Sequence, residues 1–416
     1  MTIIGSIPRR AVNLPPGALG TIFSAALSGS AVDGPEIEAF YRKFGAWAGV
    51  PYVFGASSGR SAFQLALESL GLEKGKEIIF PSFTFPVIPM VAKMLGYKPV
   101  FCDVDPVTFN SGPKEIEPLI NENTGAVLAT HLFGQPCPIA EIAALAKKRN
   151  IKVLEDCAHA LGVRVGGKSV GTFGDIGIFS FAEGKNMPCY AGGAIVTADP
   201  GIAKRAESVL SAAATPSTGN VLKKGLTIWA MWLATQPAVF GMTVYPLLRL
   251  KLMLGQPLMD SEVGNELLGT FAASKPRVYR FANLQAKIGL LQLDRIDAFN
   301  EGARRNANTL SGILEGVKGL GVPSAKAGDH IYVYYPLTVD PAKRDDLRAY
   351  LLKHGFDSKK SDMSDCSLLA EFQDAGTKRR QSGPREASIL EICVYPVIAE
   401  KSIRRLGKAI RDWAKE

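Results

Sequence analysis

The sequence predicts an α/β protein built on a mostly parallel sheet with helices on both faces. Between residues 52 and 200, short apolar runs of strand length alternate with longer segments whose apolar residues recur at helical spacing. This alternation is typical of parallel sheets, because each parallel strand reaches the next through a crossover that is usually a helix. After about residue 318 the runs become fewer, which predicts a smaller α+β domain. We therefore expect a large domain over residues 1–310 and a small domain over 311–416.

The expected elements follow the apolar runs in chain order. Strands are expected at residues 52–54, 77–80, 99–103, 126–130, 151–154, 176–179, 194–197, 331–339 and 390–394. Helices are expected at residues 22–27, 36–48, 61–70, 87–95, 139–148, 344–354 and 401–415. One long amphipathic helix is expected to end near residue 314. Residues 357–386 are polar and loop-like, so their basic run is interpreted as a solvated surface.

The composition is that of an ordinary globular protein with an excess of positive charge. The chain has 416 residues, of which 47% are hydrophobic and 21% charged, and its formal net charge is +9. This charge predicts affinity for anionic ligands or surfaces. No nucleic-acid motif is present and the basic residues are scattered, so no nucleic-acid partner is expected.

The six cysteines predict neither a disulfide framework nor a metal site. They form no CxxC pair and no zinc-like spacing: Cys102, Cys137, Cys157, Cys189, Cys366 and Cys393. We expect reduced thiols, mostly packed as small apolar residues, and no bound metal. Because residues 8–16 lead into prolines without the apolar core of a signal peptide, we expect a cytoplasmic location.

Three side chains of complementary chemistry follow strand-like runs between residues 151 and 199. Asp156 ends one run, Ser180 ends the next, and Lys185 stands five residues later among small and polar neighbours. A pyridoxal phosphate site needs an amine to form a Schiff base, a carboxylate beside the ring nitrogen and hydroxyls for the phosphate. Alone, an aspartate is usually a cap and a lysine usually solvated. Their shared position at strand ends, where open α/β sheets bind ligands, favours the cofactor site.

Another strand end supplies a loop suited to phosphate. Residues 55–59 read Gly-Ala-Ser-Ser-Gly and lie between a short strand and an apolar helix. Unpaired N–H groups at a helix N-terminus bind anions, so Ser58, Gly59 and Arg60 are candidate phosphate ligands. By itself the loop is equally well explained as an ordinary helix cap.

The chain resembles the DegT/StrS family of pyridoxal-phosphate-dependent sugar aminotransferases. The resemblance is carried by Glu155-Asp156-Cys157-Ala158-His159-Ala160, the turn Gly171-Thr172-Phe173-Gly174-Asp175, Phe179-Ser180-Phe181, Lys185 and Gly192-Gly193. It extends, with gaps, from about residue 30 to the C-terminus. It implies the aspartate-aminotransferase fold, known as fold type I, with a seven-stranded type of sheet.

The resemblance also implies roles for the candidate residues. Lys185 would hold the cofactor and act as general base, and Asp156 would keep the ring nitrogen protonated. Phe85 would stack on the ring, and His159 would lie against the cofactor without transferring a proton. The implied enzyme is a homodimer that moves an amino group, from glutamate by default, to a keto group on a nucleotide-linked or lipid-linked sugar.

Two positions depart from the family pattern. The family usually has Gly-Thr in the phosphate loop, where this chain has Gly59-Arg60. An asparagine that reaches the phosphate of the neighbouring subunit is replaced by Val278, so that contact is lost or moved, with Arg60 or Arg280 as candidates to compensate. Two other functions stay open: a deoxysugar dehydratase, whose best-known form has histidine in place of Lys185, and a non-catalytic regulator or membrane scaffold.

An apolar insertion is expected at about residues 221–270. Residues 225–248 contain no charge, Lys223-Lys224 precede them, and Gln236-Pro237 interrupt them. The length reaches that of a membrane span, but positive charge at both ends disfavours a simple crossing. We expect a broken helical hairpin on one leaflet, with Trp229, Trp232 and Tyr245 at the interface and lysines on head groups. The alternative is a buried dimer or core element.

Overall fold

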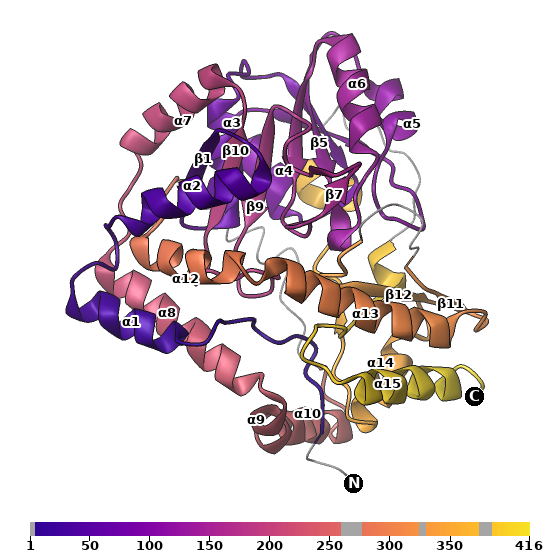
Figure 1. The fold of residues 1–416 in the computed structure, drawn as a ribbon. Helices are drawn as coiled ribbons and strands as arrows, with labels where there is room; N and C mark the ends of the chain where they lie inside the picture. Colours follow the sequence, from indigo (N-terminus) through magenta and orange to yellow (C-terminus); the bar gives the residue numbers. More distant parts are fainter. Residues whose placement is uncertain (1–4, 259–276, 324–329, 374–384) are drawn as a thin grey trace.

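The computed structural model describes residues 5–258, 277–323, 330–373 and 385–416. Its larger sheet has seven strands in the order β1-β10-β9-β6-β5-β2-β4 (Figure 1). The strands from β9 to β4 are parallel, and β10 runs antiparallel to both of its neighbours. Their bounds are Tyr52–Ala56 (β1), Glu77–Pro81 (β2), Lys98–Cys102 (β4), Thr124–Thr130 (β5), Lys152–Asp156 (β6), Ile176–Ser180 (β9) and Gly193–Thr197 (β10).

Helices cover both faces of this sheet, because successive strand residues point to opposite sides. Ile78 of β2 packs in the core beneath α3, α4 and α7, and its neighbour Ile79 packs on the other side against α6. On that second face α1, α2 and α12 cover β9 and β10. The helices are α1 (Ala18–Leu27), α2 (Glu36–Ala48), α3 (Gly59–Ser69), α4 (Val87–Met94), α6 (Ile139–Arg149), α7 (Pro200–Ser211) and α12 (Asn283–Leu293). The predicted fold class is confirmed.

A second sheet of four strands has the order β11-β12-β15-β13 and is antiparallel. Its strands are Leu320–Gly321 (β11), Tyr335–Val339 (β12), Lys359–Lys360 (β13) and Ile389–Ile392 (β15). Three helices bury their apolar sides with it: α13 (Ile296–Leu314), α14 (Arg344–Lys353) and α15 (Glu400–Trp413). The N-terminal segment contacts both the neighbourhood of the small sheet and the loop that follows β9. Arg9 forms a bidentate ion pair with Asp357, at 2.7 and 3.0 Å, and Asn13 donates to the carbonyl of Asn186.

Three expected elements differ from the structure. The strand expected at 331–339 begins only at Tyr335, because the chain before it follows a different path with Tyr332 at a positive φ of 49°. The single helix expected to run to residue 314 is two helices, since α12 ends at Leu293 and α13 begins at Ile296. Residues 357–373 are not a solvated loop, because Lys359 in β13 is buried. The basic run at 378–380 lies outside the described residues.

Up to residue 258, where the described part of the apolar insertion ends, it forms three helices. They are α8 (Thr218–Ala234), α9 (Pro237–Met242) and α10 (Val244–Met253). Pro237 sits at the first position of α9, so the chain breaks where the sequence predicted, and a second break follows Met242. Figure 1 shows α8 running beside α1 toward α9 and α10. In the described ranges, no helix combines the length and apolar character needed to cross a bilayer.

The aromatic residues of the insertion point inward, contrary to expectation. Tyr245 is buried and donates a 2.9 Å hydrogen bond to the carbonyl of Leu352 in α14. Trp229 and Trp232 are half-buried and pack against the core beneath α1 and α12. Tyr245 is therefore not placed at a membrane interface, whereas Trp229 and Trp232 each keep part of the ring exposed. The aliphatic side chains of the insertion are the exposed ones instead.

Candidate active site

The site begins where β6 and β9 end side by side. Asp156 is the last residue of β6 and Ser180 the last of β9, and Asp156 pairs with Ile178 in the parallel ladder. Because parallel strands end at one edge of the sheet, the two side chains emerge near each other. The next segment turns back through a hydrogen bond from the Lys185 N–H to the Ala182 carbonyl, which brings Lys185 to the same edge.

Lys185 lies in electrostatic contact with Asp156. Burial lowers the pKa of the Lys185 amine to about 8, and the positive charges of Lys359 and Arg10 act in the same direction. Asp156 and Asp362 oppose this change. The amine also lies 5.9 Å from the ring centre of Tyr334. An amine with such a pKa is partly neutral near pH 7, as a nucleophile or a general base must be.

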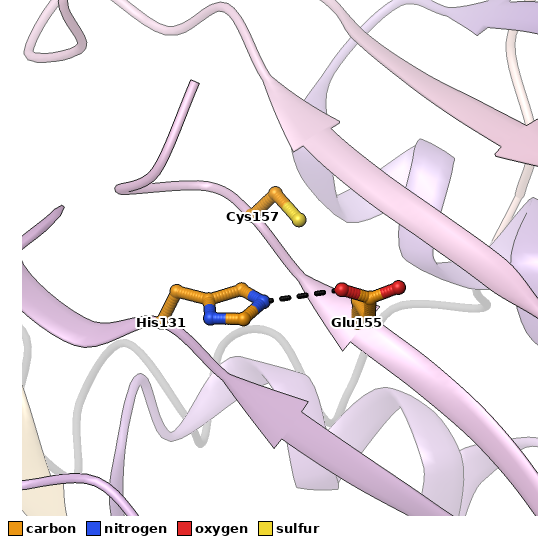
Figure 2. A group of neighbouring side chains, drawn as sticks. All are labelled: His131, Glu155 and Cys157. Carbon is orange, nitrogen blue, oxygen red and sulfur yellow. Dashed lines mark hydrogen bonds and ion pairs between the residues drawn. The ribbon is translucent and has the colours of Figure 1, made fainter. Parts of the chain in front are cut away.

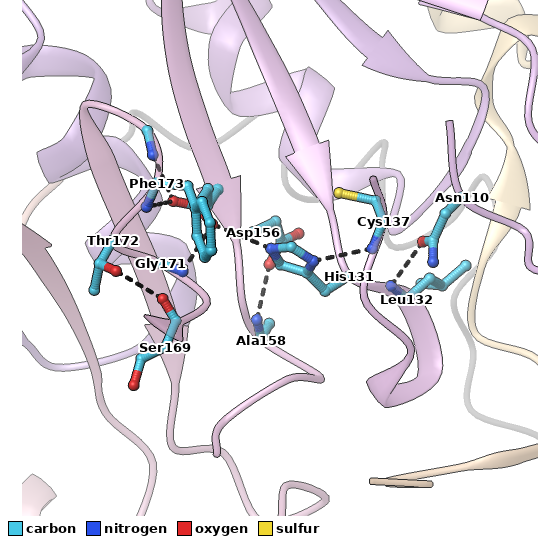
Figure 3. A network of polar contacts seen from close by, with 12 residues as sticks. Asn110, His131, Leu132, Cys137, Asp156, Ala158, Ser169, Gly171, Thr172 and Phe173 are labelled. Carbon is cyan, nitrogen blue, oxygen red and sulfur yellow. Dashed lines mark hydrogen bonds and ion pairs between the residues drawn. The ribbon is translucent and has the colours of Figure 1, made fainter. Parts of the chain in front are cut away.

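Asp156 is held in a fixed orientation. Its Oδ1 accepts a 3.0 Å hydrogen bond from the Ala158 N–H, and Figure 3 shows this contact beside His131. Burial raises the pKa of Asp156, while the Ala158 N–H and the charges of Lys185 and His131 lower it. A cationic group placed against this carboxylate would oppose the effect of burial in the same way.

His159 is neutral and shielded from water. Its Nδ1 accepts a hydrogen bond from the Phe133 N–H at 3.2 Å, so the hydrogen of the ring is assigned to Nε2. Burial, together with the charges of Lys185 and Lys359, holds the pKa of His159 well below its usual value. Its ring meets Tyr334 edge-on at 5.0 Å. A histidine with this low pKa is suited to packing rather than to proton transfer.

The phosphate loop leads into α3 as its sequence predicts. Ser58 is the N-cap, and its hydroxyl accepts a hydrogen bond from the Ser61 N–H. A Cβ atom on Gly59 would lie 2.7 Å from the hydroxyl of Ser180, so the glycine lets the hydroxyl approach the helix N-terminus. Ser58 and Arg60 also line a cavity of about 570 Å³.

The other residues that the sequence singled out are Phe85, Val278 and two arginines, and their contacts are less specific. Phe85 is half-buried and packs against two apolar clusters next to β3 (Phe83–Thr84), so its position is compatible with core packing as well as with ring stacking. Val278 is buried within its own chain and points into the core under α3. Of the two arginines expected to replace the missing asparagine, Arg60 lines the cavity, and Arg280 is not among the lining residues.

Sequence reasoning missed three residues that surround Lys185. Arg10 lies against Gly184, and the hydroxyl of Tyr334 donates to the Gly184 carbonyl at 3.1 Å. Lys359 pairs with Glu391 at 3.1 Å, and this carboxylate raises the pKa of the lysine. Arg10, Tyr334 and Lys359 come from segments distant in sequence, and no local pattern marks them.

A buried group of His131, Glu155 and Cys157 has the residue types of a metal site (Figure 2). The Glu155 oxygens are already saturated: they accept from the N–H groups of Gly171, Phe173 and Gly174 at 2.6–2.8 Å and contact His131 Nε2 at 3.3 Å. Burial raises the pKa of the Cys157 thiol to about 12, which disfavours the thiolate that metals bind. We interpret the group as a structural brace behind Asp156.

The residues present fit pyridoxal phosphate. Gly59 leaves room at a helix N-terminus beside the Ser180 hydroxyl, and the half-buried Lys185 amine interacts electrostatically with the half-buried Asp156 carboxylate at the same sheet edge. Together with the parallel seven-stranded sheet, these features define a pyridoxal-phosphate-dependent enzyme of fold type I.

The comparisons with known proteins identify the family within this class. The DegT/DnrJ/EryC1/StrS aminotransferase family matches residues 19–226 and 271–411, and the chain belongs to it. Residues 227–270, most of the insertion, fall outside the match.

Individual relatives agree with this assignment. The chain is 28% identical over 397 residues to a dTDP-3-amino-3,4,6-trideoxy-alpha-D-glucose transaminase of Streptomyces venezuelae, covering 93% of this chain and 89% of that protein. It is also 28% identical over 356 residues to a pleiotropic regulatory protein of Geobacillus stearothermophilus, covering 83% and 80%. The solved structure of an aminotransferase from Psychrobacter cryohalolentis matches with a TM-score of 0.77 at 25% identity, covering 97% and 98% of the two chains.

Proposed function

We propose that this aminotransferase moves the amino group of glutamate to a ketone on a sugar that is linked to a diphosphate carrier, either a nucleotide or a lipid. The observation that carries the proposal is the meeting of Lys185 and Asp156 at one sheet edge next to the Ser180 hydroxyl. The sugar class is supported by the similarity to the Streptomyces venezuelae transaminase.

The residues divide the work between binding and proton transfer. Pyridoxal phosphate, when bound, supplies an aldehyde that exchanges amines and a ring that accepts an electron pair. Lys185 Nζ holds the cofactor and then, released as a neutral amine, moves a proton at the substrate carbon. The Asp156 carboxylate keeps the ring nitrogen protonated. The low pKa of His159 keeps it neutral, so it positions the ring and does not compete for that proton.

The phosphate is assigned to the N-terminus of α3. Ser58, Gly59, Arg60 and Ser180 converge there, and oriented N–H groups with one guanidinium suit a dianion. Phe85 is proposed to face the ring. We further infer a homodimer and a division near residue 310 into a large domain with the seven-stranded sheet and a small domain with the four-stranded one.

We also propose that the protein works at the cytoplasmic surface of a membrane. Ten of the fifteen large apolar side chains that are exposed in the described residues belong to α1 and the insertion, and we call them the docking face: Phe23, Leu27, Leu226, Met231, Leu233, Met242, Leu247, Leu250, Met253 and Leu254. Residues 218–258 contain no acidic residue and four cations. Exposed apolar side chains on a segment whose only charges are positive suit an anionic leaflet.

The enzymatic proposal is tested by adding glutamate to the purified holoenzyme without any sugar. We expect the cofactor absorbance to bleach and one equivalent of 2-oxoglutarate to appear, with colour restored by a keto-sugar. Lys185→Ala is expected to abolish the bleaching, and Lys204→Ala on exposed α7 serves as the control. A holoenzyme that keeps its colour with glutamate would instead support the regulator reading, which the similarity to the pleiotropic regulatory protein favours.

The membrane proposal is tested by flotation of the full chain with vesicles that contain phosphatidylglycerol. Leu250→Glu and Met253→Glu place charge on the docking face and are expected to prevent flotation. Val397→Glu changes an equally exposed side chain outside the docking face and is expected to leave it unchanged. A wild-type protein that remains at the bottom of the gradient would refute the membrane location.

A further inference from the structure

The cavity beside the phosphate loop is walled by the helix that leads into the insertion. Part of its lining is Ser57, Ser58 and Ser61 at the start of α3. Another part is the start of α8, through Ser217, Asn220, Val221 and Lys224. These α8 positions are three and four residues apart, so they share one face of the helix. The cavity therefore lies between the phosphate loop and the first helix of the insertion.

This cavity is strongly cationic. Among its described lining residues are Arg60, Lys224 and Arg277, and none of them is acidic. Arg60, the N-terminus of α3 and the Ser180 hydroxyl are assigned to the cofactor phosphate. Lys224, in the first helix of the insertion, and Arg277, which follows the insertion, also line the cavity, and they suit a second phosphorylated group such as a diphosphate.

The same helix carries the docking face a short distance away. At 1.5 Å per residue, the seven residues from Lys224 to Met231 span about 10 Å of α8. Met231 is exposed, and on neighbouring α1 the side chain of Leu27 is 90% exposed. A diphosphate held at Lys224 would thus have an apolar surface within reach of a hydrocarbon chain attached to it.

We infer that the sugar substrate is carried on a long-chain lipid diphosphate. The diphosphate binds in the cavity against Lys224 and Arg277, and the lipid chain leaves along α8 into the membrane. This inference rests on the proposed function and selects one of its two carriers. A soluble nucleotide gains nothing from an apolar face beside the cavity, whereas a lipid chain gains about 0.8 kcal/mol for each CH₂ group it keeps from water.

The test uses the full-length holoenzyme and neutral phosphatidylcholine vesicles, with and without polyprenyl diphosphate. A second set of vesicles contains phosphatidylglycerol at the same total charge. We expect the vesicles with polyprenyl diphosphate to float more of the protein than the vesicles with phosphatidylglycerol. Arg277→Gln and Lys224→Gln should each reduce this increment about tenfold, the loss of one charge-assisted hydrogen bond. Lys223→Gln, on the exposed neighbouring position, is the matched control and should keep the increment.

Two results would overturn the inference. One is flotation with polyprenyl diphosphate that does not exceed that with phosphatidylglycerol, since the headgroup would then not be recognised. The other is tight binding of uridine diphosphate that is lost in Lys224→Gln, since the cavity would then take a nucleotide. The glutamate bleaching assay is independent of both, so a failed lipid assay with normal bleaching refutes the carrier and leaves the aminotransferase proposal intact.

Discussion

At the scale of single residues, the Lys185 amine lies among groups that keep it partly neutral. Its pKa falls from 10.5 to about 8, chiefly through burial. At pH 7 this change raises the neutral fraction from about 0.03% to about 10%. The negative charge of Asp156 opposes this lowering of the Lys185 pKa. The reactivity of the lysine is therefore set by the balance between burial, with the cations Lys359 and Arg10, and the carboxylates Asp156 and Asp362.

This balance predicts the pH dependence of covalent cofactor capture. The protonated amine cannot attack, so the rate of capture of pyridoxal phosphate by the apoenzyme should rise about tenfold per pH unit below pH 8 and level off above it. Rapid-mixing absorbance measures the rate. A capture rate that continues to increase above pH 8 without levelling off would mean that the amine has an ordinary lysine pKa.

Asp156→Asn should slow the glutamate half-reaction and shift the pH profile of cofactor capture. The amide keeps the size of the side chain and an oxygen for the Ala158 N–H but loses the charge. Glutamate half-reaction rates should fall about a hundredfold or more, as when one preorganised electrostatic partner is removed. Because Asp156 raises the pKa of Lys185, its loss should move the capture profile to lower pH. An unchanged profile would show that the two groups do not interact.

At the scale of elements, the end of β6 is braced from behind. The Glu155 carboxylate accepts hydrogen bonds from three backbone N–H groups of the turn before β9. His131 lies against the same carboxylate (Figure 2). Asp156 follows directly in the chain. The turn and the catalytic carboxylate are thus fixed by neighbouring residues of one strand.

Glu155→Gln should destabilise the protein without touching the cofactor directly. One acceptor oxygen becomes an NH₂ group that faces N–H donors, so the free energy of unfolding should fall by about 3 kcal/mol. Urea unfolding measures the change. Glu141→Gln on the exposed side of α6 makes the same chemical change and should have an effect within about 0.5 kcal/mol of zero. Equal effects of the two substitutions would show that the brace contributes nothing.

The sequence predicted those elements whose signal is local. The apolar runs of β6, β9 and β10 and the capped start of α3 have such local signals. The candidate residues Asp156, Ser180, Ser58 and Lys185 lie at or near the ends of these elements, so the sequence also singled them out. The break between α12 and α13 escaped prediction because apolar spacing continues through it. Residues 357–386 were expected to be a loop because they are polar, and the pairing of Lys359 with Glu391 is formed only when β13 meets β15.

At the scale of the whole molecule, the N-terminal segment connects the surroundings of the small sheet to the loop that carries Lys185. Arg9 pairs with Asp357 beside the small sheet, and Asn13 bonds to Asn186, next to Lys185. Arg10, between them, contributes to the lowered pKa of the lysine. These contacts join residues more than 150 positions apart, so only the assembled fold brings them together. The local sequence around Arg10 carried no sign of them.

The net charge of +9 and the docking face predict how membrane binding depends on salt. Between about 0.1 and 1 M salt the screening length falls from about 10 to 3 Å, which weakens the attraction of Lys223, Lys224, Arg249 and Lys251 to anionic head groups. Flotation with phosphatidylglycerol vesicles should therefore decrease several-fold and then level off, because salt does not weaken apolar insertion. Leu250→Glu should remove the part that persists at high salt. Complete loss of wild-type flotation in high salt would mean that the aliphatic side chains do not enter the bilayer. Flotation that does not change with salt would mean that the cations do not contribute to binding.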